Sequence, residues 1–284
     1  MIFRAIRPCP ALQPYIKNYL LVNLVYHPVD FPKTPYPARL EQALVFFVRG
    51  LITSHDPVTG KTVPIAANAL FGQQVSRLDF QCIAKTDFLM VQVVFQPGAL
   101  YHLLGIPSTE LTGVFCDGES VLSSELQTVN DQLANANDYT EMIERVEQYM
   151  VSKLKKVRRE AHPIDRIGKL LLDNPVPFSL GWPGLDWPGL DWLAGQANLS
   201  PRQFERKFSE RMGIGPKLYS RISRFFQTIT YKERHPDQDW LTVAVEFGYT
   251  DYNHLAKDFK QFAHVTPNVL MNEYAQRPEI IVNL

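Results

Sequence analysis

The C-terminal third of the chain contains one pattern of residues twice, and this repetition limits the possible folds more than any other feature. In the first copy, residues 190–216, a short apolar segment is followed by a tight turn. Ser200 and Pro201 then suit the N-cap and the first position of a second helix. Phe204 and Phe208 lie four residues apart, so this second helix would bury both on one face. The copy predicts a bracing helix, a turn and a second helix with a polar outer face.

The second copy spans residues 240–267 and repeats this order. Gly248 suits the turn, and Thr250 or Asp251 suits the N-cap of the helix that follows. The apolar stripe of that helix consists of Leu255, Phe259 and Phe262. Each copy therefore predicts a helix-turn-helix, in which the first helix supports the second and the second presents polar side chains. A long helix over Pro216–Arg234 would join the two units.

The N-terminal part of the chain has a different character. Up to about Gln96, short runs rich in Val and Phe alternate with turn residues, which is typical of strands, as in Ala43–Gly50 and Asp87–Gln96. The expected helices are Pro97–Pro107, Leu122–Ala134, Tyr139–Lys156, Ile164–Leu172, Leu190–Ala197, Pro201–Met212, Pro216–Arg234, Leu241–Phe247, Asp251–Phe262 and Pro267–Tyr274. We predict an α+β fold. An N-terminal β-sandwich or cupin-like barrel with flanking helices would occupy residues 1–159, and an all-α domain of two helix-turn-helix units would occupy residues 160–284.

The second copy is the more specific of the two. Residues 248–262 read GYTDYNHLAKDFKQF and are followed at 265–267 by Val-Thr-Pro. This segment resembles the signature of the AraC/XylS family of transcriptional regulators, with its glycine and aromatic residue, spaced phenylalanines and closing proline. Ala263-His264 stands where the family usually has glycine, a change that we expect to leave the fold intact. The resemblance covers about Pro163–Tyr274, whereas the first 160 residues look only like the variable sensor half of such regulators.

The resemblance implies two recognition helices on one face, about one turn of DNA apart. Seven side chains of the two second helices are expected to contact DNA: Arg202, Gln203, Arg206, Lys207, Tyr252, Asn253 and Lys257. Arg206 suits a guanine edge, Asn253 suits adenine, and Lys257 suits guanine or a phosphate. Lys207 suits a phosphate. Any one of these charged residues, taken alone, is explained by a helix face exposed to solvent. The repeated pattern favours DNA contact, because the caps, the turn, the apolar stripe and the polar face occur in both copies.

Charge differs between the two copies. The whole chain is neutral, with 29 basic and 29 acidic residues. Residues 202–234 contain nine basic and three acidic residues, a net charge of +6 that would attract phosphates. Residues 237–258 carry a net charge of −4. The second unit is therefore expected to contact DNA weakly or through few bases.

Several common motifs are absent from the sequence, and their absence limits the possible functions. The three cysteines lie far apart without CxxC spacing, which fits a reducing compartment and no disulfide framework. The N-terminus lacks a signal-peptide pattern, and the apolar runs are much shorter than the roughly 20 residues that span a bilayer. We expect a soluble, cytoplasmic protein. The seven histidines lack metal-ligand spacing, and no phosphate loop or nucleophile elbow occurs, so no metal, cofactor or catalysis is expected.

One short repeat interrupts the helical pattern. WPGLD at Trp182–Asp186 is copied at Trp187–Asp191. We interpret the copy as a lengthened surface loop, because the free energy of loop closure rises slowly with length.

The sequence thus predicts a sequence-specific DNA-binding transcription regulator whose partner is double-stranded DNA. A small molecule or dimerisation through the N-terminal domain would control it, and RNA polymerase and a second copy of the chain are further candidate partners. Aromatic residues of the strands suit either an apolar effector pocket or, for most of them, the core: Phe46, Phe47, Phe71, Phe80, Phe88 and Phe95. The alternative is a ligand-binding or enzymatic protein whose helical domain does not bind DNA. Repair proteins that join such helices to a reactive cysteine are an example, but no activated cysteine motif supports it here.

Overall fold

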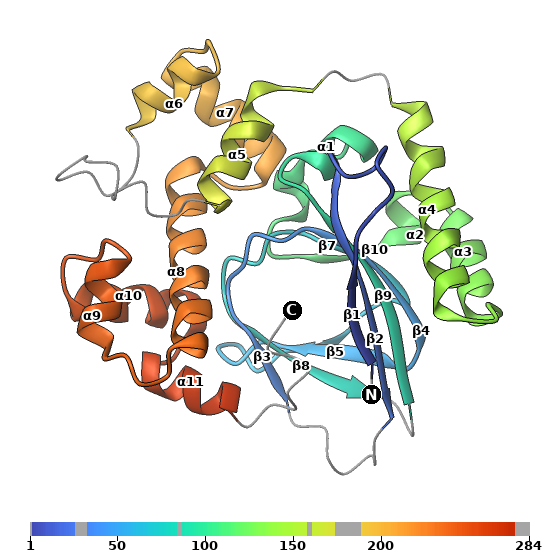
Figure 1. Cartoon of the computed structure of the whole chain (residues 1–284), viewed down its shortest axis with the longest axis horizontal. Coiled ribbons are helices and arrows are strands. Elements are labelled where there is room, and N and C mark those ends of the chain that lie inside the picture. Colours follow the sequence, from blue (N-terminus) through green and yellow to red (C-terminus); the bar gives the residue numbers. More distant parts are fainter. Residues whose placement is uncertain (1, 26–32, 84–86, 158–160, 174–188, 276–284) are drawn as a thin grey trace.

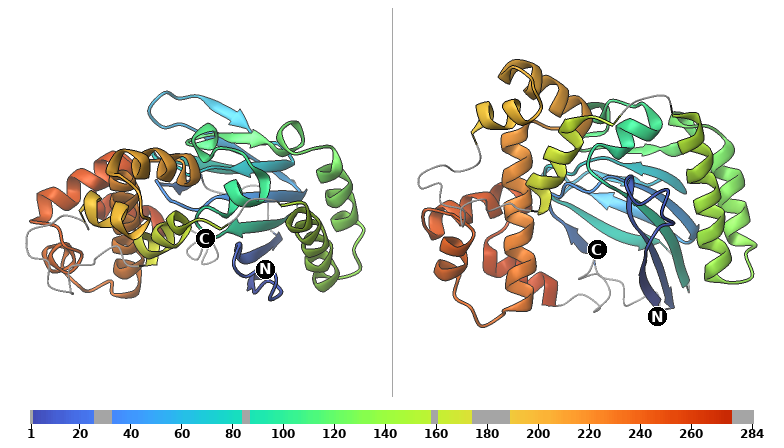
Figure 2. Two further views of the ribbon diagram at one scale, coloured as in Figure 1. Left: turned by 90° about the horizontal axis from the view of Figure 1, so that it is seen from above. Right: turned by 45° about the horizontal axis from the view of Figure 1, so that its top comes forward.

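The structure is a computed structural model that describes residues 2–25, 33–83, 87–157, 161–173 and 189–275. A sheet-rich N-terminal domain is followed by a C-terminal helical domain, so the mixed α+β fold predicted from the sequence is confirmed. Figure 1 shows the helical domain beside the sheets. Figure 2 shows that helices α3 (Glu125–Ala134) and α4 (Tyr139–Lys156) cover the opposite side of the sheet domain. The WPGLD repeat lies outside the described residues as far as position 188.

The sheet domain contains two antiparallel sheets. The larger has the order β1 (Ile2–Ile6), β2 (Ile16–Val25), β9 (Asp87–Phe95), β4 (Ala43–Arg49), β7 (Asn68–Phe71) and β10 (Phe115–Asp117). The smaller has the order β3 (Thr34–Tyr36), β8 (Leu78–Ile83), β5 (Leu51–His55) and β6 (Thr62–Pro64). This arrangement agrees with the predicted β-sandwich.

Alternation along the central strands explains this layering. Successive side chains of a strand point to opposite faces of a sheet. In β4, Leu44 and Phe46 pack beneath the flanking helices, whereas Val45 and Phe47 face the smaller sheet. Both faces of the larger sheet are thus buried, which is why its strands read as continuous apolar runs.

The helices of the sheet domain differ in detail from the prediction. The helix expected at Pro97–Pro107 is the shorter α1 (Ala99–Leu104), because Gly98 before it has a left-handed φ of 76°. The helix expected at Leu122–Ala134 is α3, which begins at Glu125, and it is preceded by a short helix that was not predicted, α2 (Gly118–Val121). The four residues of α2 are too few to show helical spacing. A 3₁₀ turn, η1 (Ser108–Leu111), follows α1.

The helical domain follows the prediction closely. Its helices are α5 (Pro163–Asp173), α6 (Leu190–Gln196), α7 (Pro201–Met212), α8 (Pro216–Arg234), α9 (Trp240–Glu246), α10 (Tyr252–Ala263) and α11 (Pro267–Ala275). The long helix α8 joins the two units by aromatic contacts. Tyr219 of α8 meets Phe208 of α7 edge-on at 5.4 Å between ring centroids, and Phe225 of α8 meets Phe259 of α10 at 5.0 Å. None of the described helices is both long and apolar enough to cross a lipid bilayer.

The core of the helical domain extends into the sheet domain. Ala38 and Leu40, which follow β3, are buried in the same cluster as Phe204 and Phe262. The two domains therefore share one continuous apolar contact rather than a hydrated gap.

We expect Phe208→Ala to lower the free energy of unfolding of the helical domain by about 3–5 kcal/mol, because it removes a fully buried ring and leaves a cavity. Urea unfolding followed by circular dichroism measures this loss. Val245→Ala is the control, since Val245 is 63% exposed and its truncation should change stability by less than about 0.5 kcal/mol. Equal losses in the two variants would contradict the assigned core.

Candidate DNA-binding interface

Helix α7 presents a polar face, and its N-cap and its buried aromatic face hold it in position. Its N-cap Ser200 accepts the Gln203 N–H, and Gln203 Oε1 in return accepts the Ser200 N–H at 3.2 Å, which is a capping box. Phe204 and Phe208 anchor the opposite face in the core. Arg202 and Arg206 lie four residues apart, so they form one exposed ridge.

Helix α10 is built in the same way. Asp251, rather than Thr250, is its N-cap, and the Asp251 carboxylate accepts the His254 N–H at 2.7 Å. Asn253 and Lys257 lie four residues apart and share an exposed ridge.

The structure places most of the predicted contact residues at the surface. Six are exposed and Lys207 is half-buried: the six are Arg202, Gln203, Arg206, Tyr252, Asn253 and Lys257. They fall into two sets, one on α7 and one on α10. The amide oxygen of Gln203 serves the N-cap of α7, so its NH₂ group is the part that can reach outward.

The predicted basic patch is partly neutralised inside the protein. Arg211 forms a two-bond ion pair with Asp165 of α5. Arg221 and Arg224 of α8 both pair with Asp258 of α10. Three of the nine cations counted in residues 202–234 therefore hold helices together, and the field that solvent meets is weaker than the sequence suggests.

Asp258 fixes α10 to α8. Its side chain is 1% exposed and accepts Arg221 Nη2 at 2.5 Å, and the Tyr249 hydroxyl donates to it at 3.2 Å. Burial raises the pKa of Tyr249, which keeps this hydroxyl protonated and able to donate. The Arg224 guanidinium stacks 4.0 Å above the Tyr249 ring. A buried carboxylate is tolerated only when it is paired in this way.

The sheet domain contacts the C-terminal end of α7. Three side chains donate to its last carbonyls: Ser108 to Arg211 O at 2.8 Å, Gln73 to Met212 O, and Thr112 to Gly213 O at 2.8 Å. Such carbonyls have no partner within their own helix. Gly213 has a φ of 89°, and any side chain there would clash with Gln73.

The sheet domain also contacts the C-terminal end of α10. The Ala38 N–H donates to Phe262 O at 3.0 Å, Arg77 Nη1 donates to Ala263 O at 3.3 Å, and Ser76 Oγ lies 2.6 Å from His264 Nε2. His264 adopts a left-handed φ of 58°, so the helix ends where a family glycine would end it. Its imidazole adds a contact that glycine lacks.

We call these six sheet-domain residues the clamp: Ala38, Gln73, Ser76, Arg77, Ser108 and Thr112. Arg39 and Gln74 join the two chain segments that carry Ala38 and Gln73, because each backbone N–H donates to the other's carbonyl, at 2.8 and 3.0 Å. Arg77 also forms a two-bond ion pair with Glu273 of α11. Sequence reasoning missed the clamp, and the one visible sign of it was His264 in place of glycine.

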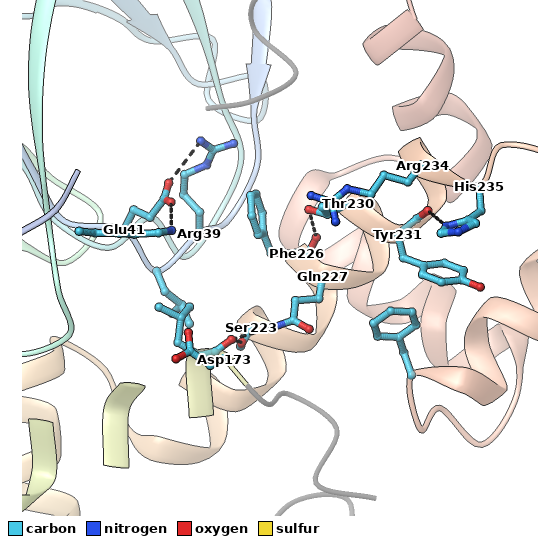
Figure 3. A pocket seen from close by; sticks show the side chains of 14 residues that line it. Arg39, Glu41, Asp173, Ser223, Phe226, Gln227, Thr230, Tyr231, Arg234 and His235 are labelled. Atoms are coloured by element: carbon cyan, nitrogen blue, oxygen red, sulfur yellow. Dashed lines mark hydrogen bonds and ion pairs between the residues drawn. The ribbon is translucent and has the colours of Figure 1, made fainter. Parts of the chain in front are cut away.

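Two cavities adjoin the clamp. One, of about 460 Å³, lies between the sheet domain and α8. Figure 3 shows Arg39 and Glu41 on its sheet side, facing Phe226, Gln227 and Thr230 on α8. The other, of about 140 Å³, lies inside the sandwich. Both are lined by Lys17, Arg39 and Glu41.

The shared wall of the two cavities is charged. Glu41 accepts Lys17 Nζ at 3.2 Å and lies 3.9 Å from Arg39 Nη1. Burial opposes ionisation of Glu41, but the two cations outweigh burial and hold its pKa below the ordinary value. The Arg39 guanidinium is stacked between the rings of Tyr36 at 4.1 Å and Phe226 at 5.3 Å.

Groups that could perform other chemistry are sparse. Within the described ranges, no three His, Cys, Asp or Glu side chains gather as a metal site. Cys9, Cys82 and Cys116 are half-buried and are not joined in disulfides, and Cys82 lies in β8.

Comparison with protein families matches this geometry. Residues 193–273, which include α7 and α10, match a family described as a helix-turn-helix domain. Residues 193–273 are an AraC-type helix-turn-helix domain. The AraC-type domain is the DNA-binding domain of transcription regulators. Residues 4–117 match a domain of unknown function, DUF6597.

The chain is similar to several solved structures, but only distantly. ToxT from Vibrio cholerae is 11% identical, with a TM-score of 0.47 over 89% of this chain and 98% of that chain. A second ToxT structure, with an unsaturated fatty acid bound, is 12% identical, with a TM-score of 0.46 over 89% and 94%. The AraC-like transcriptional activator CuxR is 14% identical, with a TM-score of 0.27 over 79% and 85%. No curated protein matches the chain at a significant level.

We expect Arg77→Ala to lower the free energy of unfolding by about 3 kcal/mol, because it leaves the buried Asp79 carboxylate and the Ala263 carbonyl without this donor. Arg49→Ala is the matched control. Arg49 pairs with Asp87 at 2.5 Å, but both side chains are more than a third exposed, so the loss should stay below about 1 kcal/mol. Urea unfolding measures both, and amide exchange should quicken in α10 and α11 for Arg77→Ala only. Unchanged exchange there would contradict the clamp.

Proposed function

We propose that this transcription regulator reads promoter DNA with α7 and α10, and that its sheet domain sets the orientation of the two helices. One observation carries the proposal: a single set of residues, the clamp, bonds to the C-terminal ends of both helices. Major-groove recognition depends on how two helices are placed along the duplex. A domain that contacts both ends is therefore able to control binding.

The contacts proposed within the grooves follow from side-chain chemistry. Arg206 would donate to a guanine edge, and Asn253 would bond to an adenine edge. Arg202, Lys207 and Lys257 would contact phosphates or further base edges. Tyr252 and the Gln203 NH₂ group lie close enough to these residues to join them.

The proposed effector is a small amphipathic acid. The cavity inside the sandwich has an apolar lining that includes Phe47, Phe71, Phe80 and Met90, and its charged wall carries Lys17 and Arg39. A ligand carboxylate would compete with Glu41, which pairs with both cations, and an apolar tail suits the lining. Of the six aromatic residues that the sequence offered for an effector pocket, three line this cavity: Phe47, Phe71 and Phe80. Phe46, Phe88 and Phe95 pack in the core.

A ligand at this wall would act directly on the clamp. Arg39 is covalently joined to Ala38, whose N–H holds α10, and its backbone pairs with Gln74 beside Gln73, which holds α7. A ligand shifts such an equilibrium only by binding one arrangement more tightly than the other.

Further parts of the proposal concern organisation and partners. We propose domains at residues 1–159 and 160–284, with the chromosome, and hence the cytoplasm, as the place of action. Contacts with RNA polymerase and a homodimer stay predictions. Because one chain carries two reading helices, a monomer would be able to bind an asymmetric site.

We expect Arg206→Ala and Asn253→Ala each to relax base preference at separate positions about one DNA turn apart, with a loss of about 1–3 kcal/mol per contact. Selection from a random DNA pool, followed by binding measurements, tests this. Arg4→Ala, an exposed arginine on β1, is the control and should leave preference unchanged. Absence of any enriched sequence for the wild type would refute the proposed function.

We expect hexanoate, but not hexanol, to change the affinity of the wild-type protein for its selected DNA, because only the carboxylate can replace Glu41 at Lys17 and Arg39. Lys17→Gln should raise the hexanoate concentration that gives half of this change about tenfold, the factor that corresponds to loss of one charge-assisted bond of about 1.4 kcal/mol. Fluorescence anisotropy of labelled DNA gives both values. Equal effects of the acid and the alcohol would count against an anionic effector.

A further inference from the structure

A third cavity lies between α8 and α10 and differs in chemistry from the two beside the clamp. Its volume is about 380 Å³. Helix α8 contributes Lys217, Ser220, Arg221 and Arg224. These positions follow the spacing i, i+3, i+4 and i+7, which is one face of a helix. The whole lining is polar or charged, so the cavity differs from an ordinary small-molecule pocket.

Helix α10 completes the cavity with three residues at the same kind of spacing, His254, Lys257 and Asp258. With His254 neutral, four cations and one carboxylate give the lining a net charge of +3. Asp258 is already engaged by Arg221 and Arg224. Among the described residues, neither Lys217 nor Lys257 forms an ion pair, so their ammonium groups are available to an anion.

We propose that this cavity holds a phosphate of the DNA backbone, an inference that rests on the proposed function. Lys257 belongs both to the cavity and to the exposed ridge of α10 that contains Asn253. Helix α8 runs from the unit of α7 to the unit of α10 (Figure 1), and the cavity lies between α10 and the N-terminal half of α8, which follows the α7 unit in the chain. A duplex that spans both helices passes its backbone across this position.

The lining favours a bare phosphodiester over a nucleotide or another phosphorylated metabolite. A nucleobase is normally bound between large aromatic or aliphatic side chains, and the lining contains no Trp, Tyr, Phe, Leu, Ile, Val or Met; its one ring is the His254 imidazole. Lysine ammonium groups and the Ser220 hydroxyl suit the oxygens of a single phosphate.

This site resolves the charge imbalance between the two units. Residues 237–258 carry a net charge of −4, which alone would repel DNA from α10. The linker helix α8 supplies Lys217 beside α10 from the basic part of the chain, in addition to Lys257 of α10 itself. Part of the positive charge that holds DNA against the second unit therefore comes from outside that unit in the sequence.

The test is Lys217→Gln, measured as DNA affinity against salt concentration. Lys217 is exposed, so the variant should fold. We expect weaker binding to every sequence by the same factor, and a slope of log affinity against log salt that is smaller by about 0.9, the value for one phosphate contact. Lys217→Arg should keep the wild-type slope. Lys155→Gln is the matched control, because Lys155 is an exposed lysine of α4 on the far side of the molecule (Figures 1 and 2).

Two outcomes overturn the phosphate site alone. One is a wild-type slope for Lys217→Gln while Arg206→Ala still relaxes base preference. The other is stabilisation of the free protein by inorganic phosphate at constant ionic strength that depends on Lys217, without any change in the DNA slope, which would indicate a site for a free anion. Failure of the wild type to select any sequence instead refutes the proposed function.

Discussion

The carbonyl groups at the C-terminal ends of α7 and α10 need partners from outside their helices, and the sheet domain supplies them. Ser108, Gln73 and Thr112 serve α7, and Ala38 and Arg77 serve α10. A buried carbonyl without a donor would cost about 1–3 kcal/mol, so the set constrains both helices strongly. The position of the sheet domain relative to α7 and α10 follows from this one requirement. The cavity beside Arg39 adjoins these contacts, and for this reason we propose that a ligand bound there changes the orientation of the two helices.

Helix α8 has a second organising role. Its aromatic residues Tyr219 and Phe225 bind the two units together, and its cations face α10. Arg221 and Arg224 satisfy Asp258, whereas Lys217 points its charge into the cavity between the helices. One helix thus sets the spacing between α7 and α10 and, in the proposed complex with DNA, supplies part of the electrostatic attraction that the second unit lacks.

The sequence predicted the parts of this structure that depend on local signals. Ser200, Asp251 and the spaced phenylalanines define α7 and α10 within a few residues, because caps and helical periodicity act over short distances. The clamp was not predictable in this way. Gln73 and Met212 are 139 positions apart, and Ser76 and His264 are 188 apart, so no periodic pattern joins them. The strength of the basic patch was overestimated for the same reason, since Arg211 is neutralised by Asp165 from another helix.

The shared core has a consequence for how such proteins are assembled from parts. Ala38 and Leu40 fill space inside the helical core, and the clamp completes its helix ends. A helical domain joined to an unrelated N-terminal domain would lack the Ala38 side chain in its core and would have carbonyl groups without donors at two helix ends. In this chain modularity is therefore limited, because the residues on the two sides of the contact between the domains have to fit one another.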